Sequence, residues 1–302
     1  MKKMLSKEEI DHSTIAYFND KFMPLAKVKI SPLDRGFLFA DGVYEVVPVY
    51  DKTLFCFDEH LSRLFKSLNS IQINTNLSKI KLLNIVNELV KRNKGNHQII
   101  YIQITRGVSK RNHAFPKNWC LPTIFAMSSE LVRPTIYERE RGVKVTILND
   151  NRWNSCNIKS ISLLANVLAR EEAYKDGCAE AVLFKNSLLT EGAASTIWIV
   201  KNDVVLIPEK SPNILEGIRI KLIKKICKKV KIGFKRCNIS YENFINAEEI
   251  FMSSATREVI AITEIKTLNK ENKIIEKKIG PVFKKIQSEY DKLINKQINL
   301  EG

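Results

Sequence analysis

Hydrophobic residues in the first 130 positions recur with two different periods. Alternation with polar residues predicts strands, whereas the spacing of three and four residues among Leu61, Leu64, Phe65 and Leu68 predicts an amphipathic helix. The same rules predict a hairpin over 14–30, a loop over 31–36, a strand over 42–50 with a hairpin partner over 53–57, a second helix over 78–92, and strands over 97–105 and 122–128.

The segment from Ser128 to Arg141 interrupts this pattern. It reads SSELVRPTIYERER, which is polar and charged and contains a proline, so it is the best candidate for a domain linker. Beyond it the pattern predicts strands over 144–148, 179–184, 195–200, 204–208, 249–254 and 259–263, and helices over 161–175, 217–231 and 281–296. The prediction is two α+β domains, residues 1–131 and 132–302, with no internal repeat.

Composition places the chain among ordinary globular proteins. Its 302 residues are 44% hydrophobic and 27% charged, which excludes disorder, collagen and a disulfide-rich mini-scaffold as descriptions of the whole. The sequence contains no apolar run of about 18 residues, so no membrane-spanning helix is expected. The N-terminus does not resemble a secretory signal. The six cysteines form no C-x-x-C pair and do not combine with histidines at metal-ligand spacing. We therefore expect free thiols, a reducing cytoplasm and no metal site.

The formal net charge of +16 raises the alternative of a nucleic-acid-binding protein. The segment 219–236 carries nine basic residues among eighteen and no acid. Its apolar residues nevertheless have helical spacing, at Leu222, Ile223, Ile226, Cys227 and Val230, and no aromatic stacking platform lies beside them. An amphipathic helix with a solvated, lysine-rich face is the simpler interpretation, so neither a nucleic-acid nor a membrane partner is expected.

Common catalytic motifs are absent from the sequence, including G-x-G-x-x-G, the P-loop, H-E-x-x-H and G-x-S-x-G. Four other segments stand out: DRGFLFADGVYEVV (34–47), EHLSRL (59–64), SCNIKSISLL (155–164) and LTEGAAS (189–195). Each has an ordinary structural interpretation when it is taken alone. These are a hairpin with a half-buried Tyr44, a solvated Arg63, one lysine among many at Lys159, and a turn acid at Glu191.

Lys159 has the clearest chemical potential of these residues. It is flanked by Ile158 and Ile161, and burial between apolar neighbours would lower a lysine pKa and release the neutral amine as a nucleophile or proton carrier.

Taken together and in order, the four segments resemble the fold-type IV aminotransferases, which use pyridoxal phosphate. The similarity runs from about Ile15 to Glu264. It implies an α+β enzyme with a smaller N-terminal α/β domain, residues 1–131, and a larger β-rich C-terminal domain with helices, residues 132–302. The segment TRGVSKRNHAFP (105–116), with its R-x-H pair Arg111 and His113, is most similar to the D-amino acid aminotransferases within this family.

The resemblance also implies roles for individual residues. Lys159 would bind the cofactor covalently and move the proton at the substrate α-carbon, and Glu191 would pair with the pyridine nitrogen. Arg63 would bind the phosphate. The remaining cofactor contacts implied are Leu215 against the ring, and Ile218, Arg219, Ser254 and Ala255 around the phosphate.

This chain departs from the family pattern at several of these positions. Arg219 stands where threonine is frequent, and Ala255 stands where a hydroxyl residue is usual. One hydroxyl contact would be lost at each position, and Arg219 would compensate if its side chain turned inward. Ala193 and Ala194 similarly replace serines after the T-E-G motif.

Substrate recognition is assigned by the resemblance to Tyr44, Arg111 and His113, with Arg111 binding the α-carboxylate. It implies a homodimer that transfers the amino group of D-alanine or another D-amino acid to a 2-oxo acid, 2-oxoglutarate, giving pyruvate and D-glutamate by a ping-pong mechanism. A branched-chain L-amino acid aminotransferase and an aminodeoxychorismate lyase remain as alternatives on the same fold.

Overall fold

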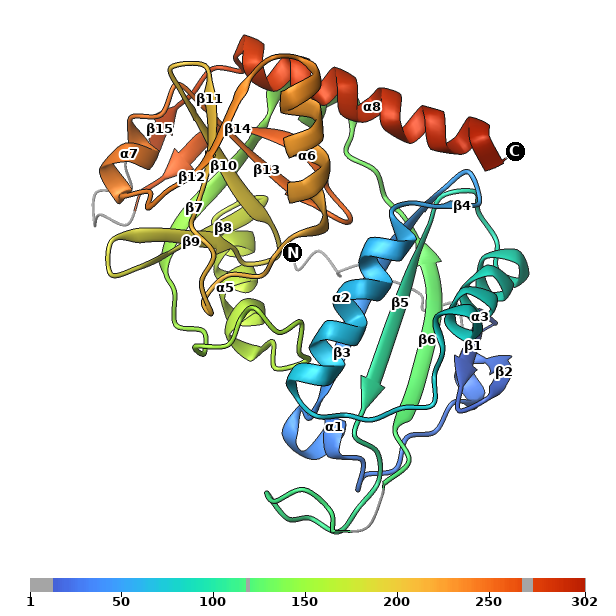
Figure 1. The fold of residues 1–302 in the computed structure, drawn as a ribbon. Coiled ribbons are helices and arrows are strands. Elements are labelled where there is room, and N and C mark those ends of the chain that lie inside the picture. The colour runs from blue at the N-terminus through green and yellow to red at the C-terminus, as the bar shows by residue number, and fades with distance from the viewer. Residues whose placement is uncertain (1–12, 118–119, 268–273, 302) are drawn as a thin grey trace, which may run out of the picture.

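The computed structural model describes residues 13–117, 120–267 and 274–301, and it contains two β-sheets that succeed one another along the chain (Figure 1). The first sheet is entirely antiparallel, with the order β2-β1-β6-β5-β3-β4. Its strands are β1 (Ile15–Phe18), β2 (Lys21–Pro24), β3 (Gly42–Tyr50), β4 (Thr53–Leu54), β5 (Gln98–Thr105) and β6 (Thr123–Glu130).

Strand β3 presents different residues to its two sides. Val43, Glu45 and Val47 are buried, and both valines pack in the core that includes helices α2 (Phe57–Ser70) and α3 (Lys79–Arg92). Tyr44 and Val46 alternate with them and are only half-buried. Because successive side chains in a strand point to opposite faces, the side away from the helices is left for a binding site.

The second sheet has nine strands, in the order β12-β11-β10-β13-β14-β7-β8-β9, with β15 paired to β14. Parallel pairs join β7 to both β14 and β8, so this sheet is mixed. Its strands are β7 (Val143–Asn149), β8 (Glu180–Lys185), β9 (Leu188–Gly192), β10 (Thr196–Lys201), β11 (Val204–Ile207), β12 (Gly233–Arg236), β13 (Glu249–Ser254), β14 (Glu258–Lys266) and β15 (Ile274–Glu276).

Helix α8 (Pro281–Glu301) connects the two parts of the molecule (Figure 1). Its Tyr290 is buried in a hydrophobic cluster with Phe55 from the first part and Trp198 and Phe251 from the second. Near its C-terminal end, the Gln297 side chain donates a hydrogen bond to the Leu54 carbonyl. The remaining helices are η1 (Leu25–Lys27), α1 (Arg35–Phe39), α4 (Ile136–Arg141), α5 (Leu164–Lys175), α6 (Ile218–Lys229) and α7 (Tyr241–Ile245).

The structure is mixed α and β as predicted, and the long predicted elements are present. Several local predictions were wrong. The hairpin predicted over 14–30 ends at Pro24, the strand predicted over 53–57 has only two residues, and the predicted loop over 31–36 already contains the start of α1. Strand β6 and helix α4 take up both ends of the predicted linker, which leaves 131–135 as the connection. The domain boundary at 131/132 stays a prediction.

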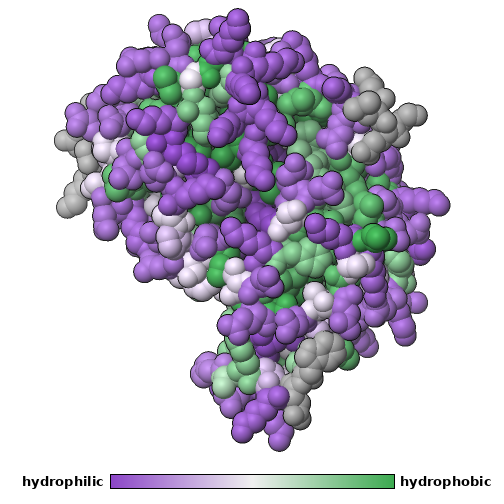
Figure 2. Space-filling view, viewed as in Figure 1, coloured by the Kyte–Doolittle hydropathy of each residue, from purple (hydrophilic) through white to green (hydrophobic). Residues whose placement is uncertain are grey.

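Helix α6 has the amphipathic form that its sequence predicts. Ile223, Ile226 and Cys227 are buried, Leu222 and Val230 pack partly against the same core, and Lys221 is exposed. Figure 2 shows a largely hydrophilic surface on one face of the molecule, with smaller hydrophobic patches. Among the described residues, no helix is long and apolar enough to cross a membrane and no cluster of His, Cys, Asp and Glu could hold a metal ion.

Candidate functional site

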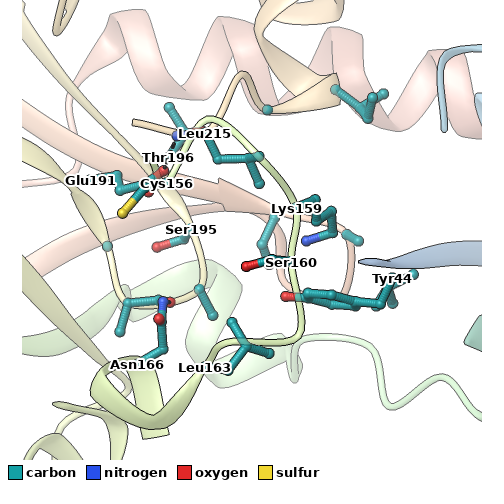
Figure 3. Close-up of a pocket in the computed structure, with 18 of the residues that line it drawn as sticks. Tyr44, Cys156, Lys159, Ser160, Leu163, Asn166, Glu191, Ser195, Thr196 and Leu215 are labelled. Carbon is teal, nitrogen blue, oxygen red and sulfur yellow. Dashed lines mark hydrogen bonds between the residues drawn. The ribbon is translucent and has the colours of Figure 1, made fainter. Parts of the chain in front are cut away.

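A cavity of about 310 Å³ brings both parts of the chain together. Every site residue predicted from the sequence except Arg111 and His113 lines it: Tyr44, Arg63, Lys159, Glu191, Leu215, Ile218, Arg219, Ser254 and Ala255. In Figure 3 the Lys159 amine lies beside the Tyr44 ring, and Glu191 lies on the opposite side of the cavity. The segments that were singled out separately in the sequence therefore form one site.

Lys159 is held through its backbone, which leaves its side chain available. Its N–H donates to Ser67 Oγ at 3.2 Å, and its carbonyl accepts from Tyr44 N–H at 3.0 Å. The Nζ atom lies 4.1 Å from the centroid of the Tyr44 ring, and within the described part of the chain it forms no ion pair with an acid. A lysine amine placed in this way can attack a carbonyl group in the cavity.

Glu191 lies within strand β9, not in the turn that its T-E-G context predicts. Its Oε1 accepts from Arg152 Nη1 at 2.5 Å, and its Oε2 accepts from the Leu215 N–H at 3.1 Å. Burial raises the pKa of Glu191 to about 7, against the opposing effects of Arg152 and the Leu215 hydrogen bond. Both oxygens are therefore fixed, and the group can hold or share a proton near neutral pH.

Arg152 also lines the cavity, although no sequence pattern predicted it. It is buried, it bridges Glu191 and Asp150, and it also donates to the Asn213 carbonyl at 3.1 Å. Thr190 Oγ1 donates to Asp150 at 2.7 Å and completes the network. No motif in the sequence identifies Arg152. Its partner Asp150 is only two residues away, but Glu191, which gives Arg152 its place in the site, is 39 residues away on strand β9.

Arg63 also lines the cavity, and helix α2 presents it beside Glu45. Arg63 Nε and Nη2 donate to the two oxygens of Glu45 at 2.6 and 2.9 Å, and Nη1 donates to the Glu216 carbonyl at 3.2 Å. His60, one helical turn earlier, lies 2.8 Å from Glu45 through Nδ1. Burial would raise the pKa of Glu45, but Arg63 and His60 lower it below its usual value. Glu45 is therefore a carboxylate that balances the charge of Arg63.

A signal for Glu45 was present in the sequence. It is the one charged residue in the strand GVYEVVPVY, and the alternation of that strand turns it towards the helix core. His60 and Arg63 are three residues apart on the next helix and so share a face. A buried carboxylate requires such partners.

Arg219 also turns inward, as the sequence analysis required if it is to compensate for the missing hydroxyls. Its residue surface is 3% exposed. Its guanidinium contacts are 3.3 Å to His60 Nε2, 3.3 Å to Tyr290 Oη and 3.5 Å to the Ala255 carbonyl. Burial lowers the pKa of His60 to about 4, so this ring is neutral, with Nδ1–H donated to Glu45 and Nε2 accepting from Arg219. Among the described residues, Arg219 forms no salt bridge with a carboxylate.

Backbone donors lie next to this cation. Helix α6 begins at Ile218, and its N-cap Gly217 provides no side-chain hydrogen bond to the first turn. The first N–H groups of a helix have no intrahelical partner and favour an anion. Ser254 Oγ accepts from the Arg257 N–H at 3.0 Å, which leaves its own hydrogen to donate. Arg63, Arg219, Ser254 and the start of α6 thus place donors that could bind an anion along one part of the cavity, which we call the anion-binding end.

Arg111 and His113 lie outside the cavity of their own chain. Both are exposed, on the loop that follows β5. The Arg111 guanidinium lies 5.5 Å from the Phe39 ring, and the His113 and Phe39 ring centroids are 5.2 Å apart. A role in the site requires this loop to reach the cavity of a second subunit, so the substrate-binding prediction remains a prediction.

Comparison with known proteins gives one consistent family. Residues 42–265 match the family model "Amino-transferase class IV". The chain is 36% identical to the D-alanine aminotransferase of Staphylococcus haemolyticus over 281 residues, which is 93% of this chain and 98% of that protein.

Solved structures agree on the fold. The branched-chain aminotransferase of Thermoproteus uzoniensis with norvaline has a TM-score of 0.84 and 21% identity, over 94% of this chain and 96% of that one. The branched-chain amino acid aminotransferase of Escherichia coli has a TM-score of 0.80 and 20% identity, over 93% of this chain and 94% of that one.

Proposed function

Because this chain belongs to the class IV aminotransferases, which are pyridoxal-phosphate-dependent enzymes, we propose that it is a D-amino acid transaminase. It transfers the amino group of D-alanine, and of other D-amino acids, to 2-oxoglutarate and gives pyruvate and D-glutamate. The observation that carries this choice is the similarity to D-alanine aminotransferases along 93% of the chain, which includes the loop with Arg111 and His113.

The chemistry of the cavity wall fits pyridoxal phosphate. A lysine amine suits the aldehyde, a buried carboxyl group with a pKa of about 7 suits the pyridine nitrogen, and two arginines with a helix N-terminus suit the phosphate. Arg219, a buried cation without a carboxylate partner in the described structure, is the feature that most requires an anion. Lys159, Glu191, Arg63, Arg219 and Ser254 would therefore hold the cofactor.

The bound cofactor supplies an electron sink for the electron pair released at the substrate α-carbon. Lys159, whose amine lies in the cavity, would take the proton from the substrate α-carbon and deliver it to the cofactor in the same half-reaction. Glu191 would pair with the protonated pyridine nitrogen of the bound cofactor, and hydrogen bonds from Arg152 and the Leu215 N–H fix the direction of its carboxyl group. Leu215 and Tyr44 line the cavity and restrict water beside the reacting atoms.

Substrate carboxylate binding requires a homodimer in this proposal, because the loop of each chain lies away from its own cavity. Arg111 of the partner subunit provides two N–H donors for the α-carboxylate, and His113 of the partner subunit assists it. Exposed apolar side chains near the cavity and the loop support such an interface, for example Phe37, Leu164, Val167 and Leu168, which are 58–74% exposed in the single chain. The six free cysteines support a reducing cytoplasm as the compartment.

Arg111→Ala tests the proposal. The wild type should convert D-alanine and 2-oxoglutarate to pyruvate, and the variant should lose at least about 100-fold in kcat/KM while its visible cofactor absorbance remains, because about 3 kcal/mol of carboxylate binding is removed. Arg92→Ala, the same replacement at an exposed arginine on α3, is the matched control. Good turnover of L-leucine without turnover of D-amino acids would instead favour a branched-chain enzyme. Cofactor binding without any amino transfer would favour a lyase.

A further inference from the structure

Arg35 is a buried arginine outside the cavity, and its contacts go to the loop that carries Arg111 and His113. It is 3% exposed and lies in the short helix α1, directly after the N-cap Asp34. Its Nη1 donates to the carbonyls of Asn112 at 2.6 Å and Ala114 at 3.3 Å, and its Nη2 donates to the His113 carbonyl at 3.3 Å. One guanidinium therefore binds three consecutive carbonyls of the loop.

A second arginine, Arg106, contacts the same loop and shares an acid with Arg35. Asp41 accepts from Arg35 Nε at 2.7 Å and from Arg106 Nε and Nη2 at 2.8 and 3.0 Å. The guanidinium carbon of Arg106 lies 3.7 Å from the centroid of the Phe115 ring. Burial would raise the pKa of Asp41, but Arg106 and Arg35 lower it, so the carboxylate stays charged between the two cations. We call Arg35, Asp41 and Arg106 the loop clamp.

The loop depends on this clamp because regular secondary structure does not support its described residues from 109 to 117. Its base is fixed at Gly107, whose φ is +99° and whose carbonyl accepts from the Arg35 N–H at 2.9 Å. A Cβ at Gly107 would lie 2.0 Å from the Leu121 carbonyl, so no other residue fits there without a shift. Beyond this base, the direction of the chain at 112–114 is set by the donors of Arg35.

We propose that Arg35 is a positioning residue for substrate binding, because it fixes the backbone from which Arg111 and His113 reach the substrate carboxylate. This inference rests on the proposed function. Fixed carbonyls at 112, 113 and 114 determine the directions in which both side chains leave the loop. An arginine is needed because its planar group offers five donors, whereas a lysine offers three donors from one point.

Arg35→Met tests the inference with two independent readouts. KM for D-alanine should rise about 10-fold or more while kcat changes less than about 3-fold, because displacement of a binding group weakens binding without altering Lys159. Cleavage of the native dimer by trypsin after Lys110 and Arg111 should become at least about 10-fold faster, because the loop opens more often. Arg35→Lys should give values of KM and of the trypsin cleavage rate between those of the wild type and those of Arg35→Met. Arg92→Met should behave as wild type.

The cofactor spectrum and the thermal unfolding midpoint establish whether each variant is folded. If Arg35→Met does not fold, Asp41→Asn provides the same two readouts with a smaller change in shape. Unchanged trypsin cleavage and unchanged KM in a folded variant overturn the inference. Faster cleavage with unchanged KM for D-alanine also overturns it, since the loop would then be clamped without serving the substrate. A wild type inactive on D-amino acids refutes the proposed function instead, and the trypsin comparison still reports on the clamp.

Discussion

Replacement of Arg219 by methionine removes a buried positive charge from the anion-binding end of the cavity. No carboxylate in the described structure balances this charge. Arg63 is neutralised by Glu45 through hydrogen bonds of 2.6 and 2.9 Å, and His60 is neutral. Arg219 is therefore the source of net positive charge there, together with the start of α6. Methionine keeps much of the side-chain volume and removes the charge and every donor.

The expected loss follows from the strength of a charge-assisted hydrogen bond to a phosphate in a buried site. Such bonds contribute about 1.5–3 kcal/mol each. Loss of about 2–3 kcal/mol corresponds to pyridoxal phosphate binding that is weaker by about 30- to 150-fold. The protein without cofactor should be no less stable than the wild type, because an uncompensated buried cation is removed.

The assay is a titration of apo-protein with pyridoxal phosphate and, separately, with pyridoxal, followed by visible absorbance. Arg219→Met should weaken binding of the phosphorylated compound and leave pyridoxal nearly unchanged. Lys221→Met removes the same charge from the exposed face of the same helix and is the matched control. An unchanged ratio of the two affinities in Arg219→Met would refute the assignment of Arg219 to the phosphate.

Two further predictions concern Glu191 and the dimer. The raised pKa of Glu191 means that the folded protein binds more protons than the unfolded chain between about pH 4.5 and 7, so this group lowers stability as pH rises through that window. His60, with its lowered pKa, has the opposite effect on the pH dependence of stability. The test is therefore the difference in free energy of unfolding in urea between Glu191→Gln and wild-type apo-protein, because His60 contributes to both proteins. The variant should gain relative stability from about pH 5 to about pH 8, and a constant or falling difference would contradict the role of burial. Mixed Lys159→Ala and Arg111→Ala chains should recover about a quarter of wild-type activity, since half of randomly formed dimers contain one complete site. Activity no higher than that of the separate variants would exclude a shared site.

The long elements of the fold were predictable because their periods were clear. Helix α2 and strand β3 have the secondary structure that the spacing of their apolar residues predicts. In each, burial of one face requires apolar residues at the period of that structure. Short elements such as α1, β9 and α7 were not predictable from the sequence. Each has only five residues, which is too few to show a clear period beside residues that favour turns. Glu191 was assigned to a turn for this reason, although pairing with β8 places it in a strand.

The site residues in the four motif segments were predictable, because the order of these segments matches the aminotransferase family. Site residues that depend on tertiary contacts were not predictable. Nine predicted residues line one cavity. Arg152, Asp150 and Arg35 were not assigned roles, because the fold alone brings them near Glu191, Thr190 and the carbonyls of Asn213 and Asn112. Arg111 lies outside the cavity of its own chain, so its predicted role depends on the proposed second subunit, which the single chain does not contain.

The stereochemistry of the substrate tests the central claim most directly. Purified enzyme with bound cofactor is incubated with 2-oxoglutarate and either D-alanine or L-leucine, and the 2-oxo acid formed and the chirality of the glutamate are measured. The account predicts pyruvate and D-glutamate from D-alanine, with kcat/KM at least about 100-fold above that for L-leucine, a difference of about 3 kcal/mol in transition-state binding. L-glutamate formed from L-leucine, with no product from any D-amino acid, would contradict it.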